Sequence, residues 1–216
     1  MAPAARVLDI GTSSGTNLRM LRDLGFTRVT GLDMSADAIA FCRAKGLGAV
    51  EQGDVCAMPF ADESFDLVLA TDIIEHVVED GRALREIARV LRPGGIALVT
   101  VPAFPLLWGL QDRVARHQRR YRMRPFRAAL EAAGLTVRRA YYFNYVLFLP
   151  ILLARRLIDM LGIRLASENE INTRRLNDVL TAIFALDVRS APFLKPPIGV
   201  SLLALVEKPA VSQSAG

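Results

Sequence analysis

The sequence predicts an α/β protein with one doubly wound, mostly parallel β-sheet. Between residues 6 and 101, short apolar runs of strand length alternate with segments that have helical spacing. The runs are apolar at consecutive positions, which is typical of strands that helices cover on both faces. The chain has 216 residues, of which 52% are hydrophobic and 23% are charged. This composition excludes a disordered protein and favours a single domain over residues 1–216.

The first half of the chain carries five strand signals and three helix signals. Leu18, Leu21 and Leu24 share one side of a helix that Gly25 ends, and Ser35 is a good N-cap for the next helix. The parallel strands are expected to be joined by right-handed crossovers. Strands are expected at Arg6–Ile10, Arg28–Leu32, Ala49–Gln52, Phe65–Ala70 and Ile96–Val101, and helices at Thr16–Leu24, Ser35–Lys45 and Gly81–Leu91.

The second half completes the sheet and adds an insertion. More than fifty residues separate its two predicted strands, which is too long for a plain loop. We interpret residues 143–197 as a helical insertion before the last strand, with helices at about 145–161 and 172–187. The other elements expected here are a helix at Pro125–Ala133 and strands at Thr136–Tyr142 and Val200–Val206.

Cysteine content and targeting signals predict a cytoplasmic protein. Cys42 and Cys56 are too few for a disulfide scaffold, and residues 1–6 lack the pattern of a signal peptide. The most apolar run, residues 145–154, is shorter than the roughly 20 residues that cross a bilayer. It predicts either a buried core helix or an interfacial helix. In the second case residues 141–165 would contact an apolar substrate or the inner face of the membrane.

The loop after the first strand indicates a nucleoside-containing ligand. Gly11 and Gly15 allow close approach of the backbone near the amino end of a helix. Asp33 ends the second strand, where a carboxylate can accept both hydroxyls of a ribose, and Asp54 follows the third strand, within reach of an adenine amino group. Each carboxylate has a plainer interpretation as a turn or helix-cap residue.

The spacing of this loop favours S-adenosylmethionine over a dinucleotide. A dinucleotide site needs G-x-G-x-x-G, whereas Gly11 and Gly15 give G-x-x-x-G. Asp9, two residues before the loop, is poorly suited to an anionic pyrophosphate but suits the ammonium group of an amino-acid tail.

The motifs resemble those of class I S-adenosylmethionine-dependent methyltransferases. The segments that carry the resemblance are Val7–Gly15, Gly31–Ser35, Gly53–Phe60, Phe65–Val77 and Glu86–Gly95. It implies a Rossmann-like sheet of seven strands in the order 3-2-1-4-5-7-6, with S-adenosylmethionine bound by residues 1–101. Ser13 replaces the middle glycine of the family's loop, where its β-carbon would crowd the cofactor or shift the loop. The implied cofactor contacts are Asp9, Gly11, Thr12, Ser13, Gly15, Asp33, Met34, Asp54, Val55 and Ala70.

Residues 102–216 resemble one branch of that family, which acts on small or lipid-linked acceptors. The resemblance lies in Leu107-Trp108, Asp112, His117 and Arg119–Tyr121. It places Trp108, Arg120 and Tyr121 on the acceptor side of the site.

Two histidines are the candidates for acid–base chemistry. A hydroxyl acceptor gains from a general base, and histidine titrates near neutral pH. His117 lies in the stretch that should face the acceptor and is the expected base for methyl transfer to oxygen, although it could also be a solvated loop residue. His76 is expected to pack near the cofactor. No metal is expected, because a turn after the fourth strand explains Asp72, Glu75 and His76.

An arginine-rich stretch lies between residues 113 and 127, in a half of the chain that carries an excess of basic residues. It favours an anionic or lipid-linked acceptor, or a phospholipid surface, or it is a solvated basic face. Nucleic acid is disfavoured because only Tyr121 interleaves as a stacking aromatic.

Two other functions stay open. One is a module that binds S-adenosylmethionine or a membrane without catalysis. The other, a short-chain dehydrogenase, is disfavoured because no Tyr-x-x-x-Lys pair is present.

Overall fold

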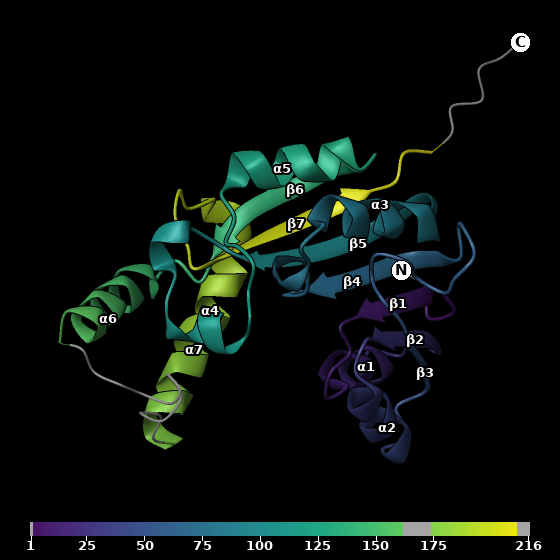
Figure 1. The fold of residues 1–216 in the computed structure, drawn as a ribbon, viewed down its shortest axis with the longest axis horizontal. Helices are drawn as coiled ribbons and strands as arrows, with labels where there is room; N and C mark the ends of the chain where they lie inside the picture. Colours follow the sequence, from purple (N-terminus) through teal and green to yellow (C-terminus); the bar gives the residue numbers. More distant parts are fainter. Residues whose placement is uncertain (1, 162–173, 211–216) are drawn as a thin grey trace, which may run out of the picture.

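The computed structural model describes residues 2–161 and 174–210 and has one seven-stranded sheet (Figure 1). The strand order is β3-β2-β1-β4-β5-β7-β6, which confirms the predicted order. Strands β1 to β5 pair in parallel, and β7 runs antiparallel to both β5 and β6. The strands are β1 Arg6–Ile10, β2 Arg28–Asp33, β3 Ala49–Gln52, β4 Phe65–Thr71, β5 Leu91–Pro102, β6 Thr136–Phe143 and β7 Ser201–Glu207.

Helices cover both faces of the sheet and divide its core into two clusters. On one face, α1 (Thr16–Asp23) and α2 (Ala36–Ala44) bury Leu18, Leu21, Ile39 and Cys42 against the strands. On the other face, α3 (Asp80–Val90) and α5 (Met123–Ala132) bury a larger cluster that includes Phe126. The predicted N-cap is confirmed, because the Ser35 hydroxyl accepts a hydrogen bond from the backbone N–H of Ala38.

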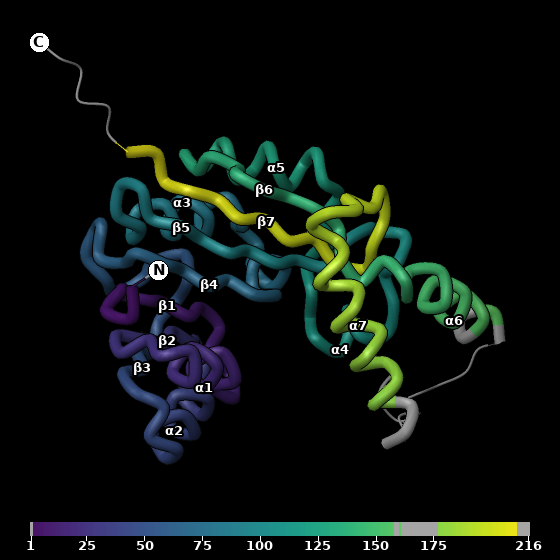
Figure 2. The backbone as a smooth tube through the Cα atoms, turned by 180° about the vertical axis from the view of Figure 1, so that it is seen from behind, coloured from purple at the N-terminus to yellow at the C-terminus, as the bar shows by residue number. Residues whose placement is uncertain are grey.

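Three more helices lie beyond the carboxyl ends of β4 and β5: α4 (Leu110–Val114), α6 (Phe148–Leu161) and α7 (Arg174–Leu194) (Figures 1 and 2). Buried Asp187 on α7 accepts the backbone N–H groups of Asn144 and Val146 at 2.6 and 3.0 Å. These bonds fix α7 to the segment that leads from β6 into α6.

Several boundaries differ from the sequence prediction. β5 begins at Leu91, because that residue pairs with Phe65 before the ladder shifts register and resumes at Ile96. Helix α7 continues through Pro192. The turn predicted after the fourth strand is the 3-10 turn η1 (Ile74–His76), whereas α4 and the 3-10 turn η2 (Pro105–Leu107) were not predicted. The first residues of the second predicted insertion helix, 172–173, lie outside the described part of the chain.

The register brings the carboxyl ends of three central strands to one level. Ile10 pairs with Leu32 on one side and with Ala70 on the other. The loops that follow β1, β2 and β4 therefore leave the sheet side by side. In an open α/β sheet, ligands bind outside the carboxyl ends of the strands, where the strand order reverses, here between β1 and β4.

Candidate functional site

A cavity of about 500 Å³ lies at this edge of the sheet. Its walls come from the loops after β1, β2, β3 and β4 and from the first turn of α3. The lining residues are Ile10, Gly11, Leu32, Asp33, Met34, Gly53, Asp54, Val55, Cys56, Ile73, His76, Val77, Val78, Glu79 and Arg82.

The turn between β1 and α1 forms the floor of the cavity. The backbone N–H groups of Gly11 and Thr12 both donate to the carbonyl of Leu32, at 2.8 and 3.1 Å. Gly11 has φ +74°, and a β-carbon there would lie 2.8 Å from the Ile73 side chain. Glycine is therefore required at this position for both conformation and space.

Asp33 ties this turn to the next strand. One carboxylate oxygen accepts the backbone N–H of Ser13 at 2.7 Å, and the other accepts that of Ser35 at 2.9 Å. Ser13 adopts φ +47°, so the turn keeps a left-handed conformation although the residue is not glycine. A carboxylate has about four acceptor sites, so Asp33 can still accept ligand hydroxyls from the cavity.

Asp9 lies beneath the turn and is fully buried. One of its oxygens accepts from the Asn17 side chain at 2.9 Å, while the other has no hydrogen-bond partner within the described residues. Burial raises the pKa of Asp9 to about 6, against the opposing hydrogen bonds from Asn17 and Thr12. A cationic ligand would favour the ionised form.

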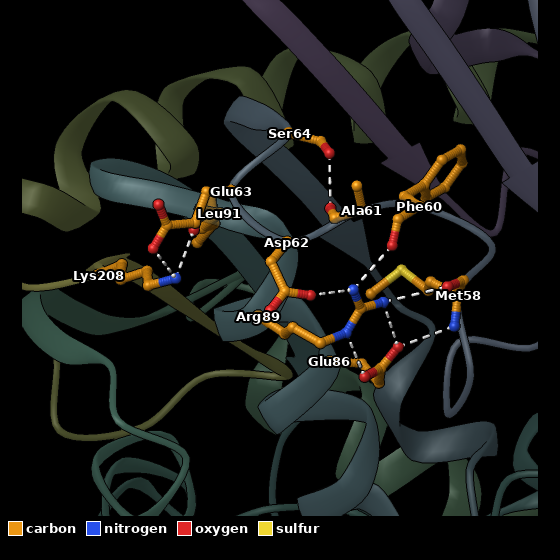
Figure 3. Close-up of polar contacts among 10 residues, drawn as sticks. All are labelled: Met58, Phe60, Ala61, Asp62, Glu63, Ser64, Glu86, Arg89, Leu91 and Lys208. Atoms are coloured by element: carbon orange, nitrogen blue, oxygen red, sulfur yellow. Dashed lines mark hydrogen bonds and ion pairs between the residues drawn. The ribbon is translucent and has the colours of Figure 1, made fainter.

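The wall after β3 is held in place by Arg89 on α3 (Figure 3). Its guanidinium donates to the carbonyls of Met58 and Phe60 and to the carboxylates of Glu86 and Asp62. Glu86 in turn accepts the Met58 backbone N–H at 2.8 Å. Because these bonds fix the chain just after Asp54–Cys56, they position that part of the cavity wall.

The ten predicted cofactor residues fall into two groups. Five of them line the cavity: Gly11, Asp33, Met34, Asp54 and Val55. The others shape the turn or the strand ends beside it: buried Thr12 donates to the Asp9 carbonyl, Gly15 precedes α1, and Ala70 is buried in β4. Ile73, Val77 and Val78 also line the cavity and were not predicted, although their place directly after a central strand is a usable signal.

On the acceptor side, Asp112 organises a buried polar cluster. It accepts the Gly109 backbone N–H at 2.8 Å, His117 Nδ1 at 2.9 Å and Arg120 Nε at 2.7 Å. Burial alone would raise the pKa of Asp112, but the Arg120 hydrogen bond and charge, with the Gly109 and His117 bonds, lower it. His117 is thus oriented by a buried carboxylate, which leaves Nε2 for other contacts.

Arg120 and Tyr121 differ from the expectation for acceptor-facing residues. Arg120 is buried and also donates to the Ala103 carbonyl at 3.0 Å, and buried Tyr121 donates its hydroxyl to Asp80 at 2.7 Å. Burial and the Asp80 bond raise the pKa of Tyr121. These bonds therefore fix the 109–121 segment to Ala103 at the end of β5 and to Asp80 at the start of α3. Trp108 is 36% exposed beside them.

Glu75, on the turn after β4, is a second buried carboxylate of a different kind. Neither oxygen has a hydrogen-bond partner among the described residues, and the nearest basic atom is His117 Nε2, 4.0 Å from Oε1. Burial and then the nearby charge of Asp72 raise the pKa of Glu75 to about 8. The His76 and His117 rings meet edge-on, with centroids 4.7 Å apart. The sequence analysis grouped Glu75 and His76 but had no signal that His117 joins them.

Comparison with known proteins supports the predicted family. A family model described as a methyltransferase domain matches residues 8–99. This match agrees with the predicted resemblance to the class I S-adenosylmethionine-dependent methyltransferases, whose cofactor is S-adenosylmethionine. The match includes the turn, both strand-end carboxylates and the segment that carries Glu75.

Curated relatives of this chain are methyltransferases named for diverse acceptors. A fatty-acid O-methyltransferase from Mycolicibacterium smegmatis is 41% identical over 100 residues, covering 44% of this chain and 36% of the relative. A phthiotriol/phenolphthiotriol dimycocerosates methyltransferase from Mycobacterium ulcerans is 39% identical, with the same two coverages. A demethylmenaquinone methyltransferase from Chlorobaculum parvum is 32% identical, covering 46% and 42%. The chain thus spans well under half the length of these relatives.

Solved structures share the fold over nearly the whole chain. A methyltransferase in complex with the Haloferax volcanii activator Trm112 superposes with a TM-score of 0.64 at 24% identity, covering 95% of this chain and 83% of the other. The [4+2]-cyclase SpnF superposes with a TM-score of 0.63 at 25% identity, covering 96% and 76%. The fold of the methyltransferase domain therefore also occurs in a protein with a different reaction.

Proposed function

We propose that this protein transfers the methyl group of S-adenosylmethionine to an oxygen of a small, apolar or lipid-linked acceptor. The observation that carries the proposal is the cavity at the carboxyl ends of β1 and β2, which joins the glycine turn to the Asp33 and Asp54 carboxylates. Its volume of about 500 Å³ is in the range of small-molecule sites. The family match over residues 8–99 supports the cofactor.

The residues of the cavity would bind and align the cofactor. We assign the ribose hydroxyls to Asp33, the adenine to the wall at Asp54 and Val55, and the amino-acid tail to the turn above Asp9. Bound S-adenosylmethionine supplies an activated methyl group, so the protein's contribution is alignment of the acceptor and exclusion of water.

The acceptor class is supported by exposed apolar stripes on the two insertion helices. On α6, Leu149, Leu153 and Leu157 lie four residues apart and are 50–68% exposed. On α7, Val179, Leu186 and Phe193 lie seven residues apart, and Phe193 is 84% exposed. Two curated relatives are named for fatty-acid and phthiotriol substrates, which also favours a lipid-like acceptor.

We further propose that the protein is cytoplasmic and that α6 contacts the inner face of the membrane. Among the described residues, no helix is long and apolar enough to cross a membrane. Residues 162–165 of the segment predicted to make this contact lie outside the described part of the chain. Exposed Arg156 on α6 would add attraction to anionic lipids.

For the chemical step, His117 is the proposed proton acceptor for a hydroxyl. Its Nδ1 is fixed by Asp112 at 2.9 Å, which is the arrangement that orients a basic imidazole. Its ring touches His76, and His76 lines the cavity.

Calorimetry with S-adenosylmethionine tests the cofactor assignment. We expect saturable binding that Asp33→Asn weakens about tenfold or more, while the matched control Asp37→Asn, an exposed carboxylate on α2, leaves it unchanged. Absence of binding by the folded wild-type chain would contradict the proposal.

Methyl transfer is tested with labelled S-adenosylmethionine and a panel of a long-chain fatty acid, a quinol and a phospholipid. Labelled product is expected for one of these lipid-like acceptors. Cofactor binding without transfer to any of them, or to cell lipids, would favour the alternative of a binding module without catalysis.

Co-sedimentation with anionic vesicles tests the membrane contact. Leu153→Ser should reduce binding, whereas Leu24→Ser, a similarly exposed leucine beside α1, should not. Salt should also weaken the binding. Equal binding by both variants would argue against α6 as the contact.

A further inference from the structure

Glu75, His76 and His117 form a cluster that none of the cofactor contacts uses. One possible ligand atom from each of these residues lies within 4.8 Å of the other two. It is the one group of three or more His, Cys, Asp or Glu side chains with such spacing in residues 2–161 and 174–210. Glu75 and His76 come from the turn η1 after β4, and His117 comes from the segment after α4.

The two buried carboxylates of this region differ in their partners. Asp112 is fully buried and bonded to Gly109, His117 and Arg120. Glu75 is equally buried, yet both of its oxygens lack a hydrogen-bond donor among the described residues. A buried carboxylate normally carries hydrogen bonds or a cation, because its desolvation is otherwise uncompensated.

The charged groups around Glu75 compensate its burial only in part. The Arg120 charge favours the Glu75 carboxylate, while its guanidinium hydrogen-bonds to Asp112 and to the Ala103 carbonyl. The nearby charges of Asp72 and Asp112 act in the opposite direction and disfavour that carboxylate. The Glu75 oxygens therefore remain without a hydrogen-bond donor among the described residues, and a bound cation would take that place.

The His117 imidazole is oriented as a metal ligand usually is. Its Nδ1 is held by Asp112 at 2.9 Å, so its Nε2 is the atom that faces Glu75. An outer contact of this kind sets the tautomer and direction of a ligating histidine. The His76 ring packs edge-on against the His117 ring, with centroids 4.7 Å apart.

We propose that Glu75, His76 and His117 bind a divalent metal ion beside the cavity. Two imidazoles and one carboxylate suit zinc and its neighbours in the first transition row, and three protein ligands leave a position open for water or an acceptor oxygen. Ligand bonds of about 2.0–2.2 Å require the ligand atoms to move closer on binding, since they now lie up to 4.8 Å apart and His117 Nε2 is 4.0 Å from Glu75 Oε1. If an ion is bound, His117 serves as its ligand, and the ion rather than the free imidazole meets the acceptor.

The test uses the full chain, freed of metal with a chelator, and Co²⁺ as a spectroscopic probe. We expect one Co²⁺ per chain, with the visible absorption of a low-coordinate site, and competition by Zn²⁺ in calorimetry. Glu75→Gln and His117→Gln should each weaken binding by at least about 100-fold, and Asp112→Asn by about 10- to 100-fold.

Matched controls separate this site from adventitious binding. Cys56→Ser removes the thiol nearest to the cavity and Glu51→Gln removes an exposed carboxylate of β3, and both should bind Co²⁺ as the wild type does. Glu75→Gln should keep its fold, because the Glu75 side chain has no hydrogen bond to lose, and circular dichroism verifies this.

The proposal is overturned if the folded wild type shows no saturable Co²⁺ or Zn²⁺ binding. It is equally overturned if Glu75→Gln and His117→Gln bind as tightly as the wild type. S-adenosylmethionine binding by the same metal-free protein is measured in parallel. Loss of metal binding alone would therefore leave the proposed methyl transfer standing, and loss of cofactor binding alone would leave the metal site standing.

Discussion

The two halves of the molecule, which we propose as the cofactor side and the acceptor side, are built by different means. The cofactor side, in residues 6–101, is a backbone structure: the turn after β1 is fixed by bonds to the Leu32 carbonyl and the Asp33 carboxylate. The acceptor side, in residues 102–210, depends on buried side chains around Asp112 that come from several segments. The family model matches residues 8–99 and not the acceptor side. A backbone turn leaves a contiguous sequence motif, whereas the side-chain cluster is spread over residues 109–120 and leaves a less specific one.

The largest effect is expected where the acceptor side loses its central carboxylate. Asp112→Ala would leave Arg120, His117 and the Gly109 N–H without their buried acceptor, at a cost of about 3–5 kcal/mol. Urea unfolding measures this cost. Glu75→Gln is the contrasting variant and should be neutral or stabilising, since its carboxylate is unpartnered. Equal losses of unfolding free energy for Asp112→Ala and Glu75→Gln would contradict the claim that only Asp112 is held by hydrogen bonds.

In the proposed cofactor side, a loss of stability is expected from a substitution that disturbs the backbone of the turn after β1. Gly15 has φ +75°, and a β-carbon would lie 2.2 Å from the Leu47 side chain. Gly15→Ala therefore combines conformational strain with a clash, and we expect a loss of about 2–4 kcal/mol. Gly25→Ala is the control, because Gly25 has φ +89° and nothing within 4 Å of the added carbon. It should cost only about 1–2 kcal/mol. Urea unfolding measures the free energy of unfolding of both variants. Similar losses of stability would show that Leu47 can move away from a β-carbon at Gly15.

A pH effect of intermediate size is expected from Asp9. Its folded pKa of about 6 lies above the ordinary value of 3.8, so the folded chain binds more protons than the unfolded one. This group therefore lowers stability as pH rises from about 4 to 6. Binding of S-adenosylmethionine, whose tail ammonium favours the carboxylate, should have the opposite trend and weaken about tenfold from pH 7 to pH 5.

Calorimetry at the two pH values measures this trend, and Asp9→Asn should abolish it. If the affinity of Asp9→Asn for S-adenosylmethionine still fell between pH 7 and pH 5, a group other than Asp9 would be responsible.

The smallest effect is expected at an exposed ion pair outside both sites. Arg127 and Glu131 on α5 lie one turn apart, with N···O 3.0 Å, and both side chains are about half exposed. Arg127→Ala should change stability by less than about 0.5 kcal/mol. A thermal melt at low and high salt checks this. A loss comparable to that of Asp112→Ala would mean that surface charge, not the buried cluster, holds the acceptor side together.

Much of the fold was predictable because its signals are local. The apolar runs at residues 6–10 and 65–70 and the Ser35 cap each act within a few residues, and the structure contains all three. Helix α4 and the early start of β5 were missed, because they depend on contacts with distant segments such as Asp112 with Arg155 and Leu91 with Phe65.

The sequence alone predicted the alternation of strands and helices and the glycine turn after β1, because hydrophobic period, glycine spacing and strand-end carboxylates are properties of neighbouring residues. The strand order followed from the family resemblance that these motifs carry. Only the tertiary structure decided that Arg120 and Tyr121 are buried supports. Only it showed that His117 joins Glu75 and His76. The physical reason is that a polar group's role depends on burial and on partners from other elements, and these are set by packing rather than by sequence distance.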